Sequence, residues 1–446
     1  MKKLPLVLSA PALVLALALC SNPTLARAQQ QPAPPTTPAA APAEQAPQKV
    51  TAYTLSPERY QKARHLAQIA FWGQIGVFFY SVVILLLVLK WRLGPKYRDW
   101  AEKVSSSRFV QALIFAPVIL ATLAILNIPT DIAYQWVSRK FGISIQGWGS
   151  WTWDWTKNLC VSLIIGTILI MILYAAIRKS PRRWWFYFWL ASLPIIALLV
   201  FLQPLIIDPL FHKFTPLSQK DPALTASLEQ LVQRAGQNIP PERIFWMGAA
   251  EKSTALNAYV TGYGASKRIV VWDTTIAKMT TPQIVFVTGH EMGHYVLHHI
   301  PKDLALLAVV FFVLFYVGYR AIGGLLAKRG AGWGVRGVDD WAALPALLVL
   351  FTIFSFIANP LTNAISRYFE HQADQYGLEV THELTPDSGQ VAAQAFQVLG
   401  DVDLADPDPI AADIFLFYDH PAMPDRVRYC LTYDPWSKGG TGEFVH

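Results

Sequence analysis

The segment His290-Glu291-Met292-Gly293-His294 carries the clearest chemical signal in this chain. It lies in a helix-compatible run from Gln283 to His299. The two histidines are four residues apart, about one helical turn, so both imidazoles face the same side and can bind one zinc ion. Glu291 lies beside them, where it can take a proton from a water molecule at the metal. The motif predicts metal-assisted hydrolysis, provided that the chain supplies a third ligand.

Three common sources of a third ligand are excluded or weak in this sequence. The continuation H-E-x-x-H-x-x-G-x-x-H would require Gly and His where Leu297 and Ile300 stand. His298 follows His294 by only one turn of the same helix, so it is better suited to supporting a ligand or to a surface position. An Asp-Gly ligand, as in intramembrane proteases of the site-2 type, is excluded because the chain contains no Asp-Gly dipeptide.

A second polar motif supplies a glutamate from a separate helix. Its members are spaced four, three and four residues apart and form one stripe on a helix: Asn363, Arg367, Glu370 and Asp374. Alone, such a stripe is typical of a solvated helix face, but beside an incomplete H-E-x-x-H it favours Glu370 as the third ligand, which makes the centre a gluzincin. We expect Asp374 to accept the N–H of a ligating histidine and Arg367 to orient a carboxylate. His371 points about 100° away from Glu370 and is a weaker ligand candidate.

The elements that position these motifs are membrane helices. The chain of 446 residues is 53% hydrophobic and only 15% charged, and apolar runs of about 18 residues, enough to cross a bilayer, recur along it. We therefore predict a predominantly α, multi-span membrane protein, in which a helical transmembrane bundle or barrel is capped by an α+β gluzincin-type zinc protease domain. Six spans are predicted: Gln68–Leu89, Phe109–Leu126, Leu159–Ile177, Trp184–Ile206, Leu304–Leu326 and Trp341–Ala358.

The distribution of charge predicts the orientation in the membrane. The short loops after the first, third and fifth spans are rich in Lys and Arg and together hold 13 of these residues, whereas the loop Asn127–Asn158 has only Arg139, Lys140 and Lys157. By the positive-inside rule the three basic loops are cytoplasmic. Asp208–Asp303 and Asn359–His446 then face the periplasm or exterior together and can assemble into one domain. This pattern also explains the net charge of +7 without a nucleic-acid partner.

The N-terminus resembles a secretory signal. Lys2 and Lys3 precede the apolar run Leu4–Leu19, and Ala26-Arg27-Ala28 fits an A-x-A cleavage site; the alternative is an uncleaved anchor helix. The three cysteines form no C-x-x-C motif, so we expect no thiolate metal site. The predicted organisation is a signal peptide (1–28), a Pro/Ala-rich tether and pre-membrane segment (29–67), four transmembrane helices (68–206), the first half of the protease domain (207–303), two transmembrane helices (304–358) and its second half (359–446).

The paired motifs resemble a known family. H-E-x-x-H at His290–His294, together with Ser366-Arg367-x-x-Glu370-x-x-Ala373-Asp374, is similar to the signature of the type 1 CAAX prenyl proteases, which are integral membrane zinc endopeptidases. The resemblance covers most of Tyr134 to Arg428. It extends to further stretches: Asn257-Ala258-Tyr259, Asp419-His420-Pro421 with Arg426, and Asp208–Phe211 with Phe214–Leu217.

The resemblance implies one zinc ion per chain, bound by His290, His294 and Glu370. Glu291 would act as general base on the attacking water and then pass the proton to the leaving amine. Asp374 would assist catalysis by holding a ligating histidine.

Further roles implied by the resemblance concern the substrate. His420 would donate a hydrogen bond to the developing oxyanion, and Arg426 would position or neutralise a substrate or active-site carboxylate. Substrate would bind as an added strand along Asn257, Ala258 and Tyr259. The alternatives are a surface histidine before a proline for His420 and an ordinary strand residue for Asn257.

The sequence thus predicts a zinc metalloendopeptidase in a bacterial inner membrane, with its active site facing the periplasm. Its expected partners are the lipid bilayer and peptide or protein substrates, either lipid-modified, membrane-associated or misfolded. The alternative is a channel or transporter whose soluble cap binds a structural zinc ion. A structural site has no need of a general base beside an open coordination position, so Glu291 favours the enzyme.

Overall fold

The computed structural model describes residues 49–262 and 264–445. The predicted signal peptide (1–28) and residues 29–48 of the predicted tether and pre-membrane segment lie outside these residues. The first described residues run extended along a helix of the C-terminal half. There the amide of Gln390 accepts a hydrogen bond from the Val50 backbone N–H and donates one to the Val50 carbonyl, at 3.0 and 2.8 Å. The chain therefore enters the bundle from the side that holds the soluble part.

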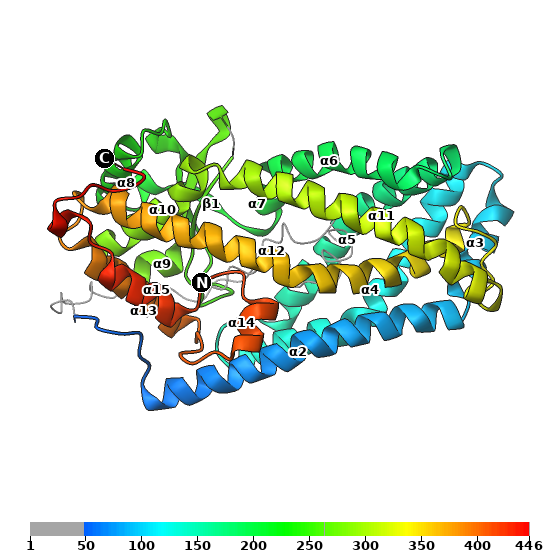
Figure 1. The fold of residues 1–446 in the computed structure, drawn as a ribbon, viewed down its shortest axis with the longest axis horizontal. Coiled ribbons are helices and arrows are strands. Elements are labelled where there is room, and N and C mark those ends of the chain that lie inside the picture. The colour runs from blue at the N-terminus through cyan, green and yellow to red at the C-terminus, as the bar shows by residue number, and fades with distance from the viewer. Residues whose placement is uncertain (1–48, 263, 446) are drawn as a thin grey trace.

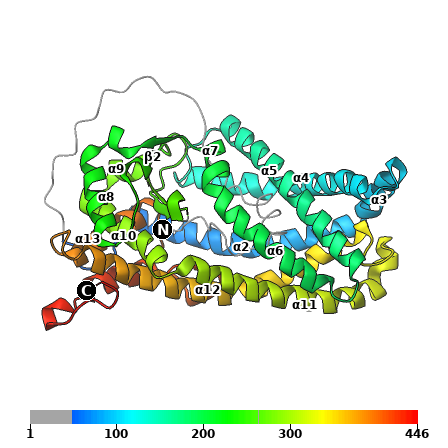
Figure 2. The same cartoon turned by 90° about the horizontal axis from the view of Figure 1, so that it is seen from above.

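Six long helices run side by side along the long axis of the molecule (Figures 1 and 2). They are α2 (Pro57–Lys90), α4 (Arg108–Lys140), α5 (Trp148–Lys179), α6 (Trp184–Leu202), α11 (His299–Trp333) and α12 (Leu344–Thr381). Five of the stretches are long and apolar enough to cross a membrane. The sixth is a pair, Trp184–Val200 and Leu205–Phe211, bent by 49° around the π-helix η1 (Gln203–Ile207). The prediction of a predominantly α, multi-span membrane protein is confirmed.

The helix connections alternate between two ends of the bundle. The end remote from the sheet holds the short helix α3 (Leu93–Val104) and the loops that follow α5 and α11. There Arg98 Nη1 lies 2.6 Å from Asp340 Oδ2 in a buried ion pair, which ties α3 to the α11–α12 connection. The three basic loops of the sequence therefore gather at one end, and both long soluble segments lie at the other.

The helices extend well beyond the predicted spans at the sheet end. The prediction of a loop over Asn127–Asn158 was wrong, because α4 and α5 occupy all of this stretch except residues 141–147. Its polar side chains find partners inside the molecule: the Trp155 Nε1–H donates to Asp131 Oδ2 at 3.0 Å. Hydropathy falls at these residues, but paired polar groups can be buried in a continuous helix.

A four-stranded sheet forms the β part of the soluble cap. Its strands are β1 (Phe214–Pro216), β2 (Ile244–Met247), β3 (Ala258–Thr261) and β4 (Arg268–Trp272). They are ordered β1-β2-β4-β3, with β2 and β4 parallel and the other two pairs antiparallel. Strand β3 therefore has an edge that no described strand pairs.

Helices surround this sheet and complete the α+β cap that the sequence predicts. The longer ones are α8 (Pro222–Arg234), α10 (Thr281–Val296), α13 (Ser388–Val402) and α15 (Met423–Thr432). The shorter elements at this end are α7 (Asp208–Phe211), η2 (Leu217–Gln219), η3 (Pro241–Arg243), η4 (Gly264–Ser266), α9 (Asp273–Lys278), α14 (Ala411–Phe417) and η6 (Trp436–Lys438). The short helix η5 (Trp341–Ala343) lies instead at the opposite end, in the α11–α12 connection beside α3. Phe286 of α10 meets Phe396 of α13 edge to face, so both halves of the cap share one core.

A buried polar cluster joins the cap to the membrane helices. Lys252, in the loop between β2 and β3, is only 2% exposed, and its Nζ lies 3.0 Å from Asp154 Oδ2 on α5. Gln146 donates to the same carboxylate oxygen at 2.7 Å. Both charges are shielded from water and paired, so this contact ties the β2–β3 loop of the cap to α5.

The closest helix contact in the cap lies between α10 and α12, and glycines permit it. A methyl group added at Gly377 would come within 3.1 Å of the His290 backbone N, and one at Gly289 within 2.9 Å of Val380 Cγ1. One at Gly293 would reach 3.1 Å from the Tyr376 side chain. The two backbones therefore approach more closely than larger residues would allow.

We predict that Gly377→Ala lowers the free energy of unfolding by about 1–3 kcal/mol, because the added methyl group overpacks this contact. Gly323→Ala is the matched control, since no heavy atom lies within 4 Å of the added methyl group; its stability should be unchanged or slightly raised. Denaturation of the purified protein in detergent measures both. Equal stability of the two variants would contradict the close-packing argument.

Candidate metal centre

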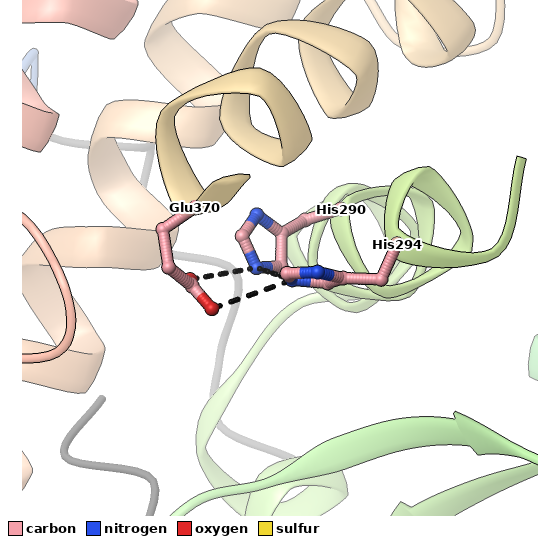
Figure 3. A group of neighbouring side chains, drawn as sticks. All are labelled: His290, His294 and Glu370. Carbon is pink, nitrogen blue, oxygen red and sulfur yellow. Dashed lines mark hydrogen bonds and ion pairs between the residues drawn. The ribbon is translucent and has the colours of Figure 1, made fainter. Parts of the chain in front are cut away.

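Three side chains from two helices converge on one point (Figure 3). The Nε2 atoms of His290 and His294, both on α10, lie 3.4 Å apart. Glu370 of α12 approaches them with Oε2 at 3.3 Å from His290 Nε2 and Oε1 at 3.4 Å from His294 Nε2. The three prospective ligand atoms lie within 4.8 Å of one another. One metal ion could contact all three.

The orientation of His290 is set by a hydrogen bond to a carboxylate behind it. Its Nδ1 lies 2.8 Å from Asp374 Oδ1, and a carboxylate can only accept, so Nδ1 carries the proton and the Nε2 lone pair faces the cluster. Arg426 of α15 donates to Asp374 through Nε at 2.8 Å and through Nη2. Asp374 thus lies behind His290, where the sequence placed it, and its role in metal binding stays a prediction.

His420 lies on the other side of Glu370. Its Nε2 is 3.2 Å from Glu370 Oε1, and its Nδ1 is 2.8 Å from Asp419 Oδ1. Burial by itself lowers the pKa of His420, but the carboxylates of Glu370 and Asp419 raise it to about 9. His420 is only 7% exposed, so the structure places it inside the site and not on the surface.

The balance of buried charge fits a divalent cation. Three carboxylates are almost inaccessible to solvent: Glu291 at 4%, Glu370 at 4% and Asp374 at 1% exposed. Arg426, at 1% exposed, pairs with two of them, Asp374 and Glu370. Uncompensated buried charge is costly, and two imidazole nitrogens with one carboxylate are donors that Zn²⁺ prefers. The residues present therefore fit a zinc ion.

The structure corrects the role expected for Arg367. Its Nη1 donates to the backbone carbonyls of Ile414, at 2.9 Å, and Tyr418. These carbonyls belong to the segment that immediately precedes Asp419 and His420. Arg367 thus braces this segment. Among the described residues it makes no ion pair with Glu291, Glu370 or Asp374, and the backbone oxygens that it does bind could not be located from the sequence.

Arg426 is enclosed by the protein. Besides its bonds to Asp374, its guanidinium lies 3.7 Å from Glu370 Oε2 and 4.1 Å from the ring centre of Phe396. Of the two roles considered for this residue, neutralising an active-site carboxylate agrees with these contacts. Its assignment as a substrate-binding residue does not, since a residue 1% exposed offers substrate no surface.

Asn257, Ala258 and Tyr259 lie at the start of the edge strand β3. The Asn257 carbonyl accepts from the Trp272 backbone N–H at 3.0 Å, which joins this residue to β4. In an antiparallel pair the bonding direction alternates, so Ala258 and Val260 present their N–H and C=O groups to the unpaired edge. Asn257 Oδ1 is buried and accepts no hydrogen bond among the described residues.

The sequence interpretation missed His299. Its Nδ1 lies 3.1 Å from Nδ1 of the ligand candidate His294. The helix expected to reach His299 ends at Val296, and α11 starts after His298, whose φ is +57°. Pro301 was the available signal, because a proline ring clashes with the carbonyl four residues earlier, here Leu297. His298, the neighbour considered at first, caps α11.

Comparison with known proteins agrees with this geometry. Residues 218–433 match the model of peptidase family M48, and residues 39–213 match that of the CAAX prenyl protease N-terminal region, described as five membrane helices. A Bacillus subtilis protein described as the uncharacterized metalloprotease YhfN is 34% identical, over 86% of this chain and 89% of its own length. CAAX prenyl protease 1 of Saccharomyces cerevisiae is 26% identical over 83% and 85%. The crystal structure of S. mikatae Ste24p superposes with a TM-score of 0.71 at 24% identity, covering 84% of this chain and 89% of that one.

Fold, site and comparisons together define an integral membrane metalloendopeptidase. The resemblance to CAAX prenyl proteases is thereby confirmed, and the channel or transporter alternative is not favoured. The chain belongs to peptidase family M48.

We predict that Arg367→Met lowers kcat by about 10–100-fold, because the segment carrying His420 loses its brace and small displacements of catalytic groups are costly. Zinc affinity should stay unchanged, since no metal ligand is touched. Peptide hydrolysis and zinc competition measure the two effects, with Arg428→Met as control because the Arg428 side chain is 72% exposed. A loss of zinc affinity in Arg367→Met would show instead that Arg367 acts on the metal cluster.

Proposed function

We propose that this protein is a zinc-dependent endopeptidase that binds one Zn²⁺ per chain through His290, His294 and Glu370. The observation that carries the proposal is the convergence of two imidazole Nε2 atoms and one carboxylate within 4.8 Å of one another. The buried negative charge around them supports a divalent cation. Three protein ligands leave a position open, as hydrolytic zinc sites require and structural ones do not.

The bound zinc ion would supply Lewis-acid polarisation of the scissile carbonyl and acidify the attacking water. Glu291, next to His290 on α10 and almost fully buried, takes the proton of that water and passes it to the leaving amine. His420 donates from Nε2 to the oxygen that becomes negative, while Asp419 fixes its Nδ1. Asp374 holds His290 in the tautomer that presents Nε2.

The substrate chain would bind along β3. Ala258 and Val260 offer backbone donors and acceptors at the edge that no described strand pairs, so a peptide can add as a further strand. Main-chain pairing makes little demand on side chains, which suits an enzyme with many substrates. Arg426 neutralises part of the charge of Asp374 and Glu370 and does not itself contact the substrate.

The active site would face the periplasm of a bacterial inner membrane. The basic loops after α2, α5 and α11 lie at the end of the bundle remote from the metal cluster. Loops rich in Lys and Arg stay in the cytoplasm, which places the cap on the opposite side. The apolar run at the N-terminus, read as a secretory signal, agrees with this orientation.

The substrates proposed are membrane-associated or misfolded polypeptides of the cell envelope, including lipid-modified ones. Both ligand-bearing helices adjoin membrane spans, so the site lies beside the bilayer. Relatives named CAAX prenyl protease 1 support a preference for peptides attached to membranes. The Bacillus subtilis relative is described only as a metalloprotease.

We predict that Glu291→Gln lowers the hydrolysis of a quenched peptide by about 10²–10⁴-fold, because the general base is lost while shape is kept. The zinc content should equal that of the unchanged protein. Glu383→Gln is the matched control, since the Glu383 side chain is 68% exposed and should leave turnover unchanged. Full activity of the Glu291→Gln protein, or none in zinc-loaded unchanged protein, would disprove the proposed mechanism.

The orientation predicts which introduced cysteines an impermeant thiol reagent can reach. In a chain whose native cysteines are replaced by alanine, Ser437→Cys should react in intact spheroplasts, because residue 437 is exposed in the cap. Lys328→Cys, exposed at the opposite end, should react only after lysis. The reverse pattern would place the active site in the cytoplasm.

A further inference from the structure

The two histidines of the cluster have different partners behind them. His290 is backed by the Asp374 carboxylate, whereas His294 Nδ1 faces His299 Nδ1 at 3.1 Å. His299 is 1% exposed, and its ring stacks on Phe369 with centroids 4.5 Å apart and planes inclined by 14°. It is therefore held in one orientation beside His294.

The break between α10 and α11 brings His299 to this position. In a continuous helix, residues five apart point about 140° away from each other, so the two rings could not meet. The helix ends at Val296 and resumes at His299, after His298 with its φ of +57°. Pro301 disfavours one unbroken helix, because its ring would clash with the Leu297 carbonyl.

The hydrogen bonds around His299 determine which nitrogen carries its proton. Its Nε2 lies 3.2 Å from Gln372 Oε1, an acceptor, while Gln372 Nε2 donates to the Tyr368 hydroxyl at 3.2 Å. His299 Nε2 is therefore the donor, and its Nδ1 keeps a lone pair. That lone pair accepts the Nδ1–H of His294, which leaves the Nε2 lone pair of His294 directed at Glu370 and His290.

We propose that His299, held by Gln372, is the positioning residue of His294: it fixes the tautomer and ring orientation in which His294 binds the metal. The inference rests on the proposed zinc site. It implies that His290 is supported by an anionic partner, Asp374, and His294 by a neutral partner, His299. Partners behind metal-bound histidines commonly change metal affinity by about 10–100-fold.

The test measures zinc affinity by chelator competition on the purified full-length protein, without reference to proteolysis. His299→Phe keeps the ring that stacks on Phe369 but removes the acceptor, and zinc should bind about 10–100-fold more weakly. His299→Asn can place Oδ1 near the former Nδ1, so it should restore most of the affinity. The absorption spectrum of the Co²⁺-substituted protein should change in His299→Phe and return towards the original in His299→Asn.

Two outcomes overturn the inference. Zinc affinity of His299→Phe equal to that of the unchanged protein shows that His299 acts by packing alone, and equal losses in the Phe and Asn variants show that an acceptor at this position does not support His294. If the unchanged protein itself binds no zinc, the proposed function fails instead, so the two failures are distinguishable.

A second pair of variants tests the same chain of hydrogen bonds from its outer end, where folding is less at risk because Gln372 is only partly buried. Gln372→Glu keeps an acceptor for His299 Nε2–H and should preserve zinc affinity. Gln372→Leu removes it and should weaken binding, by a smaller factor than His299→Phe. Equal zinc affinity in the two Gln372 variants contradicts the proposed chain of hydrogen bonds from Gln372 through His299 to His294.

Discussion

The close contact of α10 with α12 is the constraint on which the rest of the site depends. Two prospective ligands lie on one helix and the third on the other, so the separation of the helix axes sets the size of the metal cluster. Glycine at positions 289, 293 and 377 brings the backbones together, and the shared core around Phe286 and Phe396 keeps them there. The ligand geometry is thus held by apolar packing before any metal binds, which is preorganisation in the usual sense.

Packing alone would not make this group of side chains stable, because the group places the carboxylates of Glu291, Glu370 and Asp374 close together and away from water. Arg426 resolves part of the conflict from a third helix, α15, through its two bonds to Asp374. A guanidinium cannot lose its charge under ordinary conditions. The positive charge that it places beside the carboxylates therefore does not vary with pH, as the charge of an imidazole would. The remaining negative charge fits the divalent cation that is proposed for this site. The metal cluster is therefore complete only when α10, α12 and α15 are all in place, although they come from two segments separated by a pair of membrane helices.

The parts of this protein that were predicted from sequence are those governed by local periodicity. Helical spacing placed His290, His294, Glu370 and Asp374, and hydropathy located the membrane spans, because both depend on neighbouring residues alone. The errors concern contacts between distant segments. Arg367 bonds to carbonyls 47 and 51 residues away, and the helical continuation over Asn127–Asn158 depends on polar pairs such as Trp155 with Asp131. His299 is an intermediate case. Pro301 is a local signal for the break in the helix, but the direction in which the chain resumes, and hence the contact of His299 with His294, is not local.

That break also explains how a membrane helix can adjoin a catalytic helix without dictating its direction. The α12 helix continues from the sixth span into the site, so Glu370 and Asp374 move with that span. The α10 helix, in contrast, is separated from α11 by Leu297 and His298, so its direction follows its packing in the cap. The two ligand-bearing helices can then lie side by side at the spacing that the glycines permit, while α11 and α12 keep the directions that the bilayer requires. The short break at Leu297 and His298 thereby allows α10 to take the direction that the metal site needs and α11 to take the direction that the membrane bundle needs.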